Sequence, residues 1–484
     1  METLLKDVRQ QSSKSIRGGA VCLVNPPNEK IVLRDMYSST ISKGVYNWPN
    51  VDLLCISGIL KEDFAVHLID ANTLGYTCEE TVDKITRLNP VAIVFSFGNS
   101  VKEDDYRFVQ QLRKRLPGIK ICGTGGLLYH SPESELRAHP EFDACLLNFT
   151  TKDVLKFLLD DYDDLNNIVY RVDDKIITRP RKYYEHQFSF PVPLHEQLPL
   201  SKYKVSHGFQ KPLTAVLTAF GCPAKCGFCV SGRIDYRYRS AENIIEELNV
   251  VKALNVKEIF FRDNVFGAVK KESTKLMEQM VANDYRFSWV ADTRANLITE
   301  ESAPLMRKSG CHALHMGVES ASDETLKKYH KGIGIEKMKK PFKLCKDHGI
   351  QSLGYFIIGL PGETVDDIKR TIDLAIQLDC DFASFNMAMP IIGTDLRDEA
   401  LSKGYISDET SAKYDGSLQP LIESEHLKKQ QILMMRKEAF RRFYLRPSYI
   451  AKRISKVRTM FQVHMLFLEA YNLIRRQADS NNLS

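Results

Sequence analysis

The sequence predicts an α/β protein: an N-terminal doubly wound parallel sheet, then a partial barrel of six strand–helix units, then a helical C-terminal region. Three observations lead to this prediction. The chain has 484 residues, and because a single core stops growing at about 250–300 residues, it holds more than one domain. Between residues 20 and 165, and again from 213 to 390, short apolar runs alternate with stretches of helical spacing. Continuous apolar strands separated by helices form parallel sheets that are covered on both faces.

The first domain is expected over residues 20–165, after a polar and flexible tail at 1–19. Its buried strands are expected at 20–27, 65–71, 91–98, 119–126 and 144–149. A doubly wound sheet binds its ligands beyond the carboxyl ends of its strands. At those ends the sequence places loops of small or turn-forming residues, at 25–27, 96–100 and 123–126.

A change of composition separates this domain from the barrel. Residues 166–205 predict a small hairpin followed by a proline-punctuated linker. The alternation resumes in the barrel, residues 206–420, whose strands are expected at 213–220, 258–263, 287–293, 313–320, 353–360 and 382–390. A barrel of this kind carries its active site at the carboxyl ends of its strands. Residues 421–484 are expected to form a basic helical region.

The composition is that of a globular protein in a reducing compartment. Hydrophobic residues make up 43% of the chain and charged residues 26%. No apolar run approaches the roughly 20 residues that cross a bilayer, and the N-terminus lacks the apolar block of a secretory signal. A cytoplasmic location is therefore expected. Eight of the eleven cysteines are scattered singly, which is typical of buried core positions, and the other three lie close together.

These three are in the stretch GCPAKCGFCV, which holds Cys222, Cys226 and Cys229 directly after the first barrel strand. Spacings of three and two intervening residues allow the loop to bring three thiolates to one metal centre. A structural zinc ion needs a fourth ligand. The stretch CHALH at 311–315 could be nominated, but it lies in a strand-like run whose side chains alternate between faces. Three thiolates suit a [4Fe–4S] cluster with one iron left open for substrate.

The cysteine loop resembles the CxxxCxxC signature of the radical S-adenosylmethionine (SAM) superfamily, including an aromatic residue, Phe228, before the last cysteine. The resemblance implies that Cys222, Cys226 and Cys229 ligate the cluster and that SAM binds the open iron. One electron from the cluster would then cleave SAM to methionine and a 5′-deoxyadenosyl radical. By the same resemblance, Phe228 lies against the adenine.

Further stretches follow in the order that this family shows, over about residues 210–400. GVES resembles the fourth-strand element, where Glu319 and Ser320 would hold the amino group or ribose of SAM. GYFIIGLPGET resembles the fifth-strand glycine motif, in which Gly359 lets the backbone approach the adenine. MPIIGTDL is similar to the turn after the sixth strand. The second and third strand ends offer Arg262, Asp263, Asn264 and Arg294.

A flavodoxin-like (Rossmann-like) parallel domain before such a barrel resembles the cobalamin-binding class of radical SAM enzymes, which includes C-methylases and the anaerobic magnesium-protoporphyrin ester cyclase. The resemblance implies that the loops after the strands make room for a flat corrin, with Asn99, Gly123 and Gly125 as contacts. Two features depart from these relatives. No DxHxxG sequence supplies a histidine to cobalt, and LNFTT at 147–151 replaces an acidic turn.

The implied function is activation of an unactivated C–H bond, with cobalamin for C-methylation or with ring formation as the outcome. One alternative is a cobalamin-independent radical SAM oxidoreductase or cyclase with a vestigial first domain. A methylthiotransferase would need further clustered cysteines, and those of the first domain are dispersed. An alternative from another class is a non-catalytic iron–sulfur electron carrier or sensor. The implied partners are a small-molecule substrate, such as a lipid, a tetrapyrrole-like compound or another natural product, and an external electron donor of the flavodoxin or ferredoxin type.

The net charge of +6 resides in the C-terminal region, because residues 426–476 hold thirteen Lys or Arg against two Glu. Cationic clusters mixed with aromatic and aliphatic residues predict either a helical cap on the barrel or a peripheral contact with the inner membrane surface. The basic residues are confined to this element and no RNA-binding module is recognised, so nucleic acid is not expected as a partner.

Overall fold

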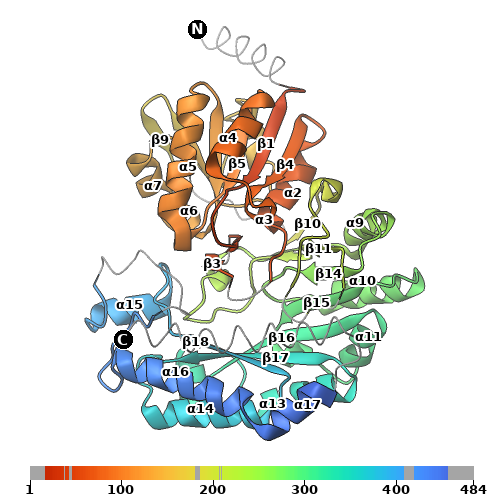
Figure 1. Ribbon diagram of the computed structural model, residues 1–484, viewed down its shortest axis with the longest axis vertical. Helices are drawn as coiled ribbons and strands as arrows, with labels where there is room; N and C mark the ends of the chain where they lie inside the picture. Colours follow the sequence, from red (N-terminus) through yellow and green to blue (C-terminus); the bar gives the residue numbers. More distant parts are fainter. Residues whose placement is uncertain are drawn as a thin grey trace.

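The structure is a computed structural model that describes residues 17–36, 39–42, 46–179, 186–205, 208, 210–407 and 419–455. Two α/β domains lie one above the other in Figure 1, the first domain in red and orange and the barrel in green and blue. Strand β3 (Ser39–Ile41), which belongs to the first domain in sequence, lies between the two.

The first domain is built on a seven-stranded sheet of order β4-β1-β5-β6-β7-β8-β9. Its strands are β1 (Ala20–Asn25), β4 (Ala65–Asp70), β5 (Ala92–Ser96), β6 (Lys120–Thr124), β7 (Ala144–Leu146), β8 (Ile168–Val172) and β9 (Lys175–Ile177). The first five pair in parallel, which confirms the predicted doubly wound sheet. The expected hairpin is formed by β8 and β9, and it joins the same sheet by antiparallel pairing with β7. The sheet therefore continues past residue 165.

Helices cover this sheet. They are α2 (Val51–Leu60), α3 (Ala71–Leu74), α4 (Cys78–Arg87), α5 (Lys102–Arg115), α6 (Gly126–His130), α7 (Pro132–Ala138) and α8 (Asp153–Leu158), with a 3-10 turn at Asn99–Val101. All ten residues of α2 are buried, because the linker packs against it. A Cβ atom on Gly58 would come 2.1 Å from the carbonyl oxygen of Pro191, so only glycine permits this approach.

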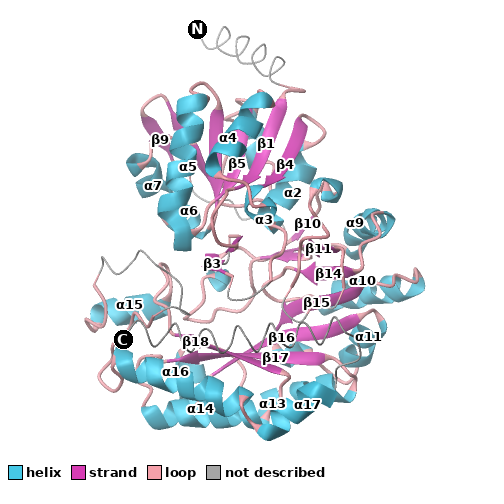
Figure 2. Ribbon diagram, viewed as in Figure 1, coloured by secondary structure: helices cyan, strands magenta, loops and turns pink. Residues whose placement is uncertain are grey.

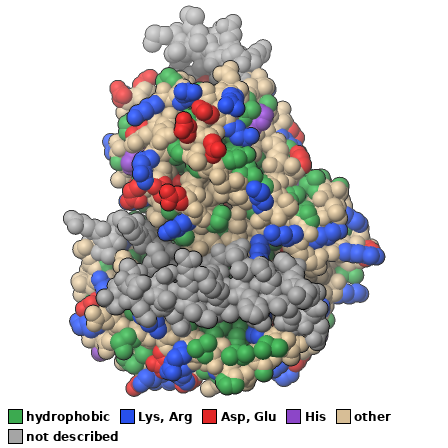
Figure 3. All heavy atoms as spheres, viewed as in Figure 1, with side chains coloured by type: hydrophobic (Ala, Val, Ile, Leu, Met, Phe, Trp, Pro, Cys, Tyr) green, Lys and Arg blue, Asp and Glu red, His purple; other side chains and the backbone are tan. Residues whose placement is uncertain are grey.

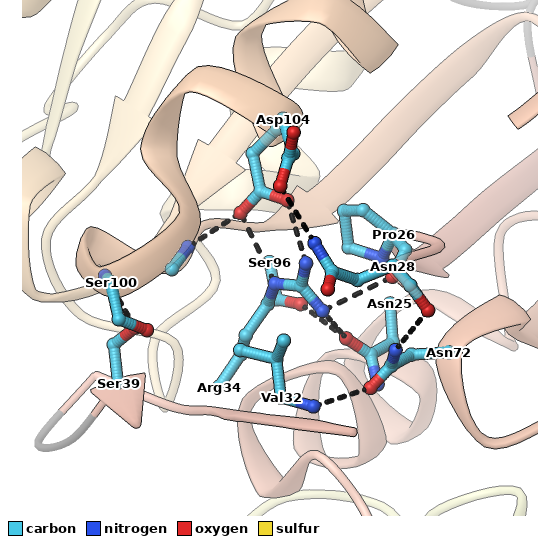
Figure 4. A network of polar contacts seen from close by, with 12 residues as sticks. Asn25, Pro26, Asn28, Val32, Arg34, Ser39, Asn72, Ser96, Ser100 and Asp104 are labelled. Atoms are coloured by element: carbon cyan, nitrogen blue, oxygen red, sulfur yellow. Dashed lines mark hydrogen bonds and ion pairs between the residues drawn. The ribbon is translucent and has the colours of Figure 1, made fainter. Parts of the chain in front are cut away.

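The segment between β1 and α2 was not predicted as an ordered element. It forms two short antiparallel strands, β2 (Val32–Arg34) and β3. Arg34 is fully buried and anchors the segment at the carboxyl ends of β1 and β5 (Figure 4). Its guanidinium donates two hydrogen bonds to Asp105, of 2.7 and 3.1 Å, and two more to Asn25 Oδ1 and the Pro26 carbonyl.

The barrel is an open six-stranded sheet whose strands follow in sequence order and pair in parallel throughout. They are β11 (Leu213–Val216), β14 (Glu258–Phe261), β15 (Ser288–Thr293), β16 (Cys311–Glu319), β17 (Gln351–Ile358) and β18 (Phe382–Met387). Figure 2 shows helices along the outer side of these strands, which confirms the predicted partial barrel. Those helices include α9 (Ala241–Ala253), α10 (Lys270–Ala282), α11 (Ser302–Lys308), α13 (Ile335–Asp347) and α14 (Val365–Gln377). The short helix α12 (Asp323–Lys328) follows β16.

A small three-stranded sheet joins the linker to the cysteine loop. It has the order β10-β13-β12 and consists of β10 (Gln187–Phe188), β13 (Arg237–Arg239) and β12 (Ala219–Phe220). Short 3-10 turns lie at His195–Gln197, Ser231–Arg233 and Ala295–Leu297. Because β12 leads directly into residue 221, this sheet fixes where the cysteine loop begins.

The C-terminal part of the described chain consists of α15 (Asp395–Ser402), α16 (Lys429–Tyr444) and α17 (Pro447–Ser455). Helix α16 caps the barrel, since Phe443 packs on Phe385 of β18 and the Tyr444 hydroxyl bonds the backbone of Ala383. Figure 3 shows hydrophobic side chains among cations along the lower edge of the molecule, where α16 and α17 lie in Figure 1. Among the described helices, none combines the length and the apolar character of a membrane span. Membrane contact stays a prediction, and residues 456–484 of the basic tail lie outside the described residues.

Candidate functional site

The cysteine loop follows β12 and is clamped by two neighbouring elements. The Gly227 N–H donates to the Tyr329 carbonyl at 2.8 Å, and the Leu396 N–H donates to the Gly227 carbonyl at 3.0 Å. A Cβ atom on Gly227 would come 2.8 Å from Asp395 Oδ2. The loop therefore lies tightly against the end of α12 and the start of α15, where Asp395 and Leu396 belong to the stretch MPIIGTDL.

The end of β14 holds the loop at both of its flanks. Asp263 is fully buried and accepts the N–H groups of Thr218 and Ala219 at 2.7 and 3.0 Å, directly before the loop. Asn264 accepts the Ser231 hydroxyl at 2.9 Å, directly after it. Burial raises the pKa of Asp263 to about 6, although these hydrogen bonds oppose the shift.

The three thiols are free, and Cys226 and Cys229 lie close enough to Cys222 to raise the pKa of its thiol. Burial raises the pKa of Cys222 to about 11 and also raises that of Cys229. Arg294 lies beside them, with Nη1 3.5 Å from Cys226 Sγ. Its guanidinium supplies an N–H donor and a positive charge where deprotonated sulfur would carry negative charge.

The donor set suits a cluster better than a single ion. Throughout the described ranges, no three His, Cys, Asp or Glu side chains converge as ligands of one metal ion. A [4Fe–4S] cluster binds each cysteine through a different iron, so its ligands need not share a common point. Three free thiols on a clamped loop fit such a cluster and leave its fourth iron without a ligand from the loop.

A buried ion pair lies at the end of β16. Glu319 Oε1 is 2.6 Å from Lys331 Nζ, and both side chains are nearly inaccessible. The strand is irregular here: its register with β17 shifts between Gly317 and Glu319, and Glu319 has a φ of 72°. A Cβ atom on Gly317 would lie 2.1 Å from Glu319 Oε1 and 2.6 Å from Lys331 Nζ. The glycine of GVES thus makes room for this ion pair.

The ends of β16 and β17 share one carboxylate. Glu363 accepts the Ser320 hydroxyl at 2.9 Å through Oε1 and the Gly359 and Leu360 N–H groups at 3.0 Å through Oε2. Burial raises the pKa of Glu363 to about 7. Ser320 and Gly359, which the sequence assigned to separate motifs, are therefore brought together by a residue that the sequence did not single out.

Phe228 is half-buried and packs against Tyr329, with ring centroids 6.1 Å apart. It belongs to a small apolar cluster that also includes Leu360 and Leu396. Phe228 thus lies beside the elements that follow β17 and β18. A contact between Phe228 and adenine stays a prediction.

Asn99, Gly123 and Gly125 lie at the carboxyl ends of β5 and β6, where they were expected. The Asn99 Oδ1 accepts the Leu127 N–H at 3.0 Å, at the start of α6. Gly123 and Gly125 serve internal packing, because a Cβ atom would come 2.4 Å from Leu128 Cδ1 at 123 and 2.5 Å from the Phe97 carbonyl at 125. Their contacts with a corrin stay predictions.

The LNFTT stretch, which replaces the expected acidic turn, contacts the barrel. The Phe149 ring packs edge-on against Phe220 of β12 with centroids 5.1 Å apart. The Thr150 hydroxyl accepts a hydrogen bond of 3.2 Å from Arg237 of β13. This loop therefore connects the first domain to β12, which leads into the cysteine loop, and to β13, which follows it.

Two important residues were missed from the sequence. Glu363 stood inside a quoted motif, and its position two residues after a proline turn was a signal that could have been used. Lys331 lies in an unremarkable polar stretch, and nothing in the sequence marks it as the partner of Glu319.

A clamped three-cysteine loop at the carboxyl ends of a six-stranded parallel barrel is the arrangement expected of a radical SAM enzyme. Residues 216–375 match the profile of the Radical SAM superfamily, so the chain contains a radical SAM domain. A radical SAM domain works with a [4Fe–4S] cluster and SAM, so these are the cofactors that the barrel implies.

Particular relatives extend the likeness to both domains. The chain is 28% identical to an uncharacterized methyltransferase, PH0819, of Pyrococcus horikoshii, over 90% of this chain and 94% of that one. It is 24% identical to the anaerobic magnesium-protoporphyrin IX monomethyl ester cyclase of Rubrivivax gelatinosus, over 88% of this chain and 79% of the cyclase. Among solved structures, the cobalamin-dependent SAM radical enzyme OxsB superposes with a TM-score of 0.72 and 17% identity, over 95% of this chain and 72% of OxsB. At that identity the likeness concerns the fold.

Proposed function

We propose that this enzyme methylates an unactivated carbon of a small-molecule substrate and uses cobalamin besides the cluster and SAM. The observation that carries the proposal is the extent of the fold likeness to OxsB, which includes the first domain as well as the barrel. The methyltransferase relative supports methylation as the outcome. Ring closure is the second candidate, and the likeness to the ester cyclase favours it.

In this proposal the barrel residues bind and orient the cofactors. Cys222, Cys226 and Cys229 hold the cluster, and the Arg294 guanidinium donates toward Cys226. When bound, the cluster supplies the electron that cleaves SAM, and cobalamin supplies the methyl group. Glu319 and Ser320 hold the amino group or ribose of SAM. Lys331 orients Glu319, and Glu363 orients Ser320.

Corrin binding is proposed at the carboxyl ends of β5 and β6, beside Asn99, Gly123 and Gly125. Thr124, between the two glycines, has a buried hydroxyl that finds no hydrogen-bond partner within the described chain. A buried polar group without a partner costs stability, and a ligand's amide could satisfy it. An external one-electron donor of the flavodoxin or ferredoxin type would deliver the electron.

Anaerobic purification tests this function. We expect iron and cobalt in the protein, formation of 5′-deoxyadenosine under reductant, and transfer of deuterium from methyl-labelled SAM to a product. Cys226→Ala should remove the iron, whereas Cys380→Ala, which changes a buried thiol that contacts the Ala375 carbonyl of α14, should retain it. Iron without cobalt would overturn the cobalamin part. A full iron complement after alanine replaces all three loop cysteines would overturn the cluster assignment.

A further inference from the structure

A polar cluster lies where the first domain meets the inside of the barrel. Arg262, directly after β14, is held by Asp35 of the first domain, with Nη2 and Nε 2.7 and 3.1 Å from Asp35 Oδ2. Its Nη1 lies 3.5 Å from Asp292 Oδ2 on β15. One guanidinium therefore connects a carboxylate from each domain.

Asp292 is the member of this cluster that remains accessible. Its Oδ1 lies 3.1 Å from His315 Nδ1 on β16 and accepts the Tyr355 hydroxyl of β17 at 3.3 Å. The Asp292 side chain keeps 21% of its surface exposed, whereas those of Arg262 and His315 keep 8% and 4%. An ionised carboxylate accepts more hydrogen bonds than these, so the exposed edge can receive another donor.

Aromatic rings from the first domain border the same place. Tyr46 and Trp48 stack with centroids 5.8 Å apart and an interplanar angle of 8°, and both are half-buried. Trp48 packs edge-on against Phe260 and lies 5.8 Å from the Arg262 guanidinium carbon. Flat rings beside a carboxylate favour a cationic group or a flat ring as ligand.

The Asp292 carboxylate is the group of this cluster that favours a cationic ligand. Asp35 and Asp292 face the Arg262 guanidinium, and His315 lies beside Asp292. Of the two carboxylates, Asp35 is buried, whereas Asp292 keeps an exposed edge, and a donor that carries positive charge makes the stronger hydrogen bond to such an edge.

We propose that Asp292, Tyr355 and the Tyr46–Trp48 ring pair form the substrate subsite, and that Asp292 accepts a hydrogen bond from a protonated amine of the substrate. The inference rests on the proposed function, because the subsite shares β16 and β17 with the expected SAM contacts. His315 lies four residues before Glu319 on β16, and Tyr355 of β17 lies four residues before Gly359, which follows that strand. Four residues span about 13 Å along a strand. A substrate bound here would lie between the SAM site and the first domain.

Tryptophan fluorescence gives a test that needs no turnover. The chain has two tryptophans, and Trp289 is fully buried in the core, so a ligand at the subsite acts on the emission of Trp48. The probe is 2-phenylethylamine, with 3-phenylpropanoate as an anion of similar shape. We expect saturable quenching by the amine and none by the anion. Asp292→Asn should weaken amine binding about tenfold or more, because it removes the charged acceptor of the amine's hydrogen bond.

Controls separate the subsite from the proposed function. Trp48→Phe should abolish the signal, and Asp366→Asn, an exposed carboxylate of α14, should leave amine binding unchanged. If Asp292→Asn fails to fold, Tyr355→Phe provides the second variant and should weaken binding several-fold. Equal binding of amine and anion, or unchanged amine affinity in both variants, would overturn the subsite. Protein that makes 5′-deoxyadenosine but binds no amine overturns the subsite alone, and protein that binds the amine but cleaves no SAM overturns the function alone.

Discussion

The hydroxyl of Ser320 donates a 2.9 Å hydrogen bond to the buried carboxylate of Glu363 and thereby ties the end of β16 to the end of β17. The second oxygen of Glu363 accepts two backbone N–H groups of the turn that follows β17. None of these donors is a cation, and burial raises the pKa of the carboxyl to about 7. Protonation of Glu363 is therefore linked to folding.

This linkage predicts a pH dependence of stability. A carboxyl whose folded pKa is raised stabilises the fold below its unfolded pKa, near 4.5, and that contribution is lost as pH rises toward about 7. Glu363→Gln should therefore lose less stability than the wild type between these two pH values, by roughly 3 kcal/mol at most. Burial raises the pKa of Asp263 as well, so part of the decrease in stability with rising pH should remain in Glu363→Gln. Urea unfolding midpoints at both pH values measure the effect, with exposed Glu301→Gln as control. An identical slope in wild type and Glu363→Gln would refute the linkage.

Removal of the interdomain ion pair should destabilise the protein strongly. Arg262→Met leaves Asp35 buried without its cation, and breaking a buried pair by removing one partner costs about 3–5 kcal/mol. The double variant Arg262→Met with Asp35→Leu should recover part of this loss, because no unpaired charge remains at Asp35. Thermal unfolding measures both. Lys270→Ala, which breaks an exposed pair with Glu301, is the control and should change nothing measurable. A double variant less stable than Arg262→Met would contradict the explanation.

Periodicity and spacing predicted the sheets and the cysteine loop because those features are local in the sequence. Alternating apolar runs located all six barrel strands, and the three thiols were visible within one turn. The strands β2 and β3 were missed because they are three residues long and are held by distant partners such as Asp105. Packing contacts carry no such local signal.

The site illustrates the same limit. Glu319 was chosen from its motif, but its partner Lys331 comes from a stretch after α12 that only the fold brings near. Gly123 was predicted to clear space for a ligand, and the structure gives it a packing role under Leu128, which a sequence cannot distinguish. Pairs that cross between domains, such as Arg262 with Asp35, depend on how the two domains dock.

Asn264 should contribute to retention of the iron–sulfur cluster but little to the stability of the fold. Asn264→Ala removes the acceptor of the Ser231 hydroxyl after the cysteine loop. Residues that orient ligands in this way typically change metal affinity about 10–100-fold. Iron retained against a chelator after anaerobic reconstitution measures the loss, and circular dichroism should be unchanged. Asn249→Ala, which releases Tyr285 on the outer side of the barrel, is the matched control. Iron retention equal to the wild type in Asn264→Ala would show that the cysteine loop keeps its conformation without the hydrogen bond to Asn264.

Gly317→Ala should weaken SAM binding although residue 317 is not itself an expected SAM contact. The added methyl would lie 2.1 Å from Glu319 Oε1 and 2.6 Å from Lys331 Nζ, so the ion pair that orients Glu319 must open. We expect SAM affinity to fall about tenfold or more, which corresponds to about 1.4 kcal/mol. Lys331→Met should act in the same direction, because it leaves the buried Glu319 carboxylate without its cation. Gly118→Ala adds a methyl group to open space and provides the matched control. Equilibrium dialysis of SAM with anaerobically reconstituted protein measures all three, and wild-type affinity in both Gly317→Ala and Lys331→Met would remove Glu319 from the SAM site.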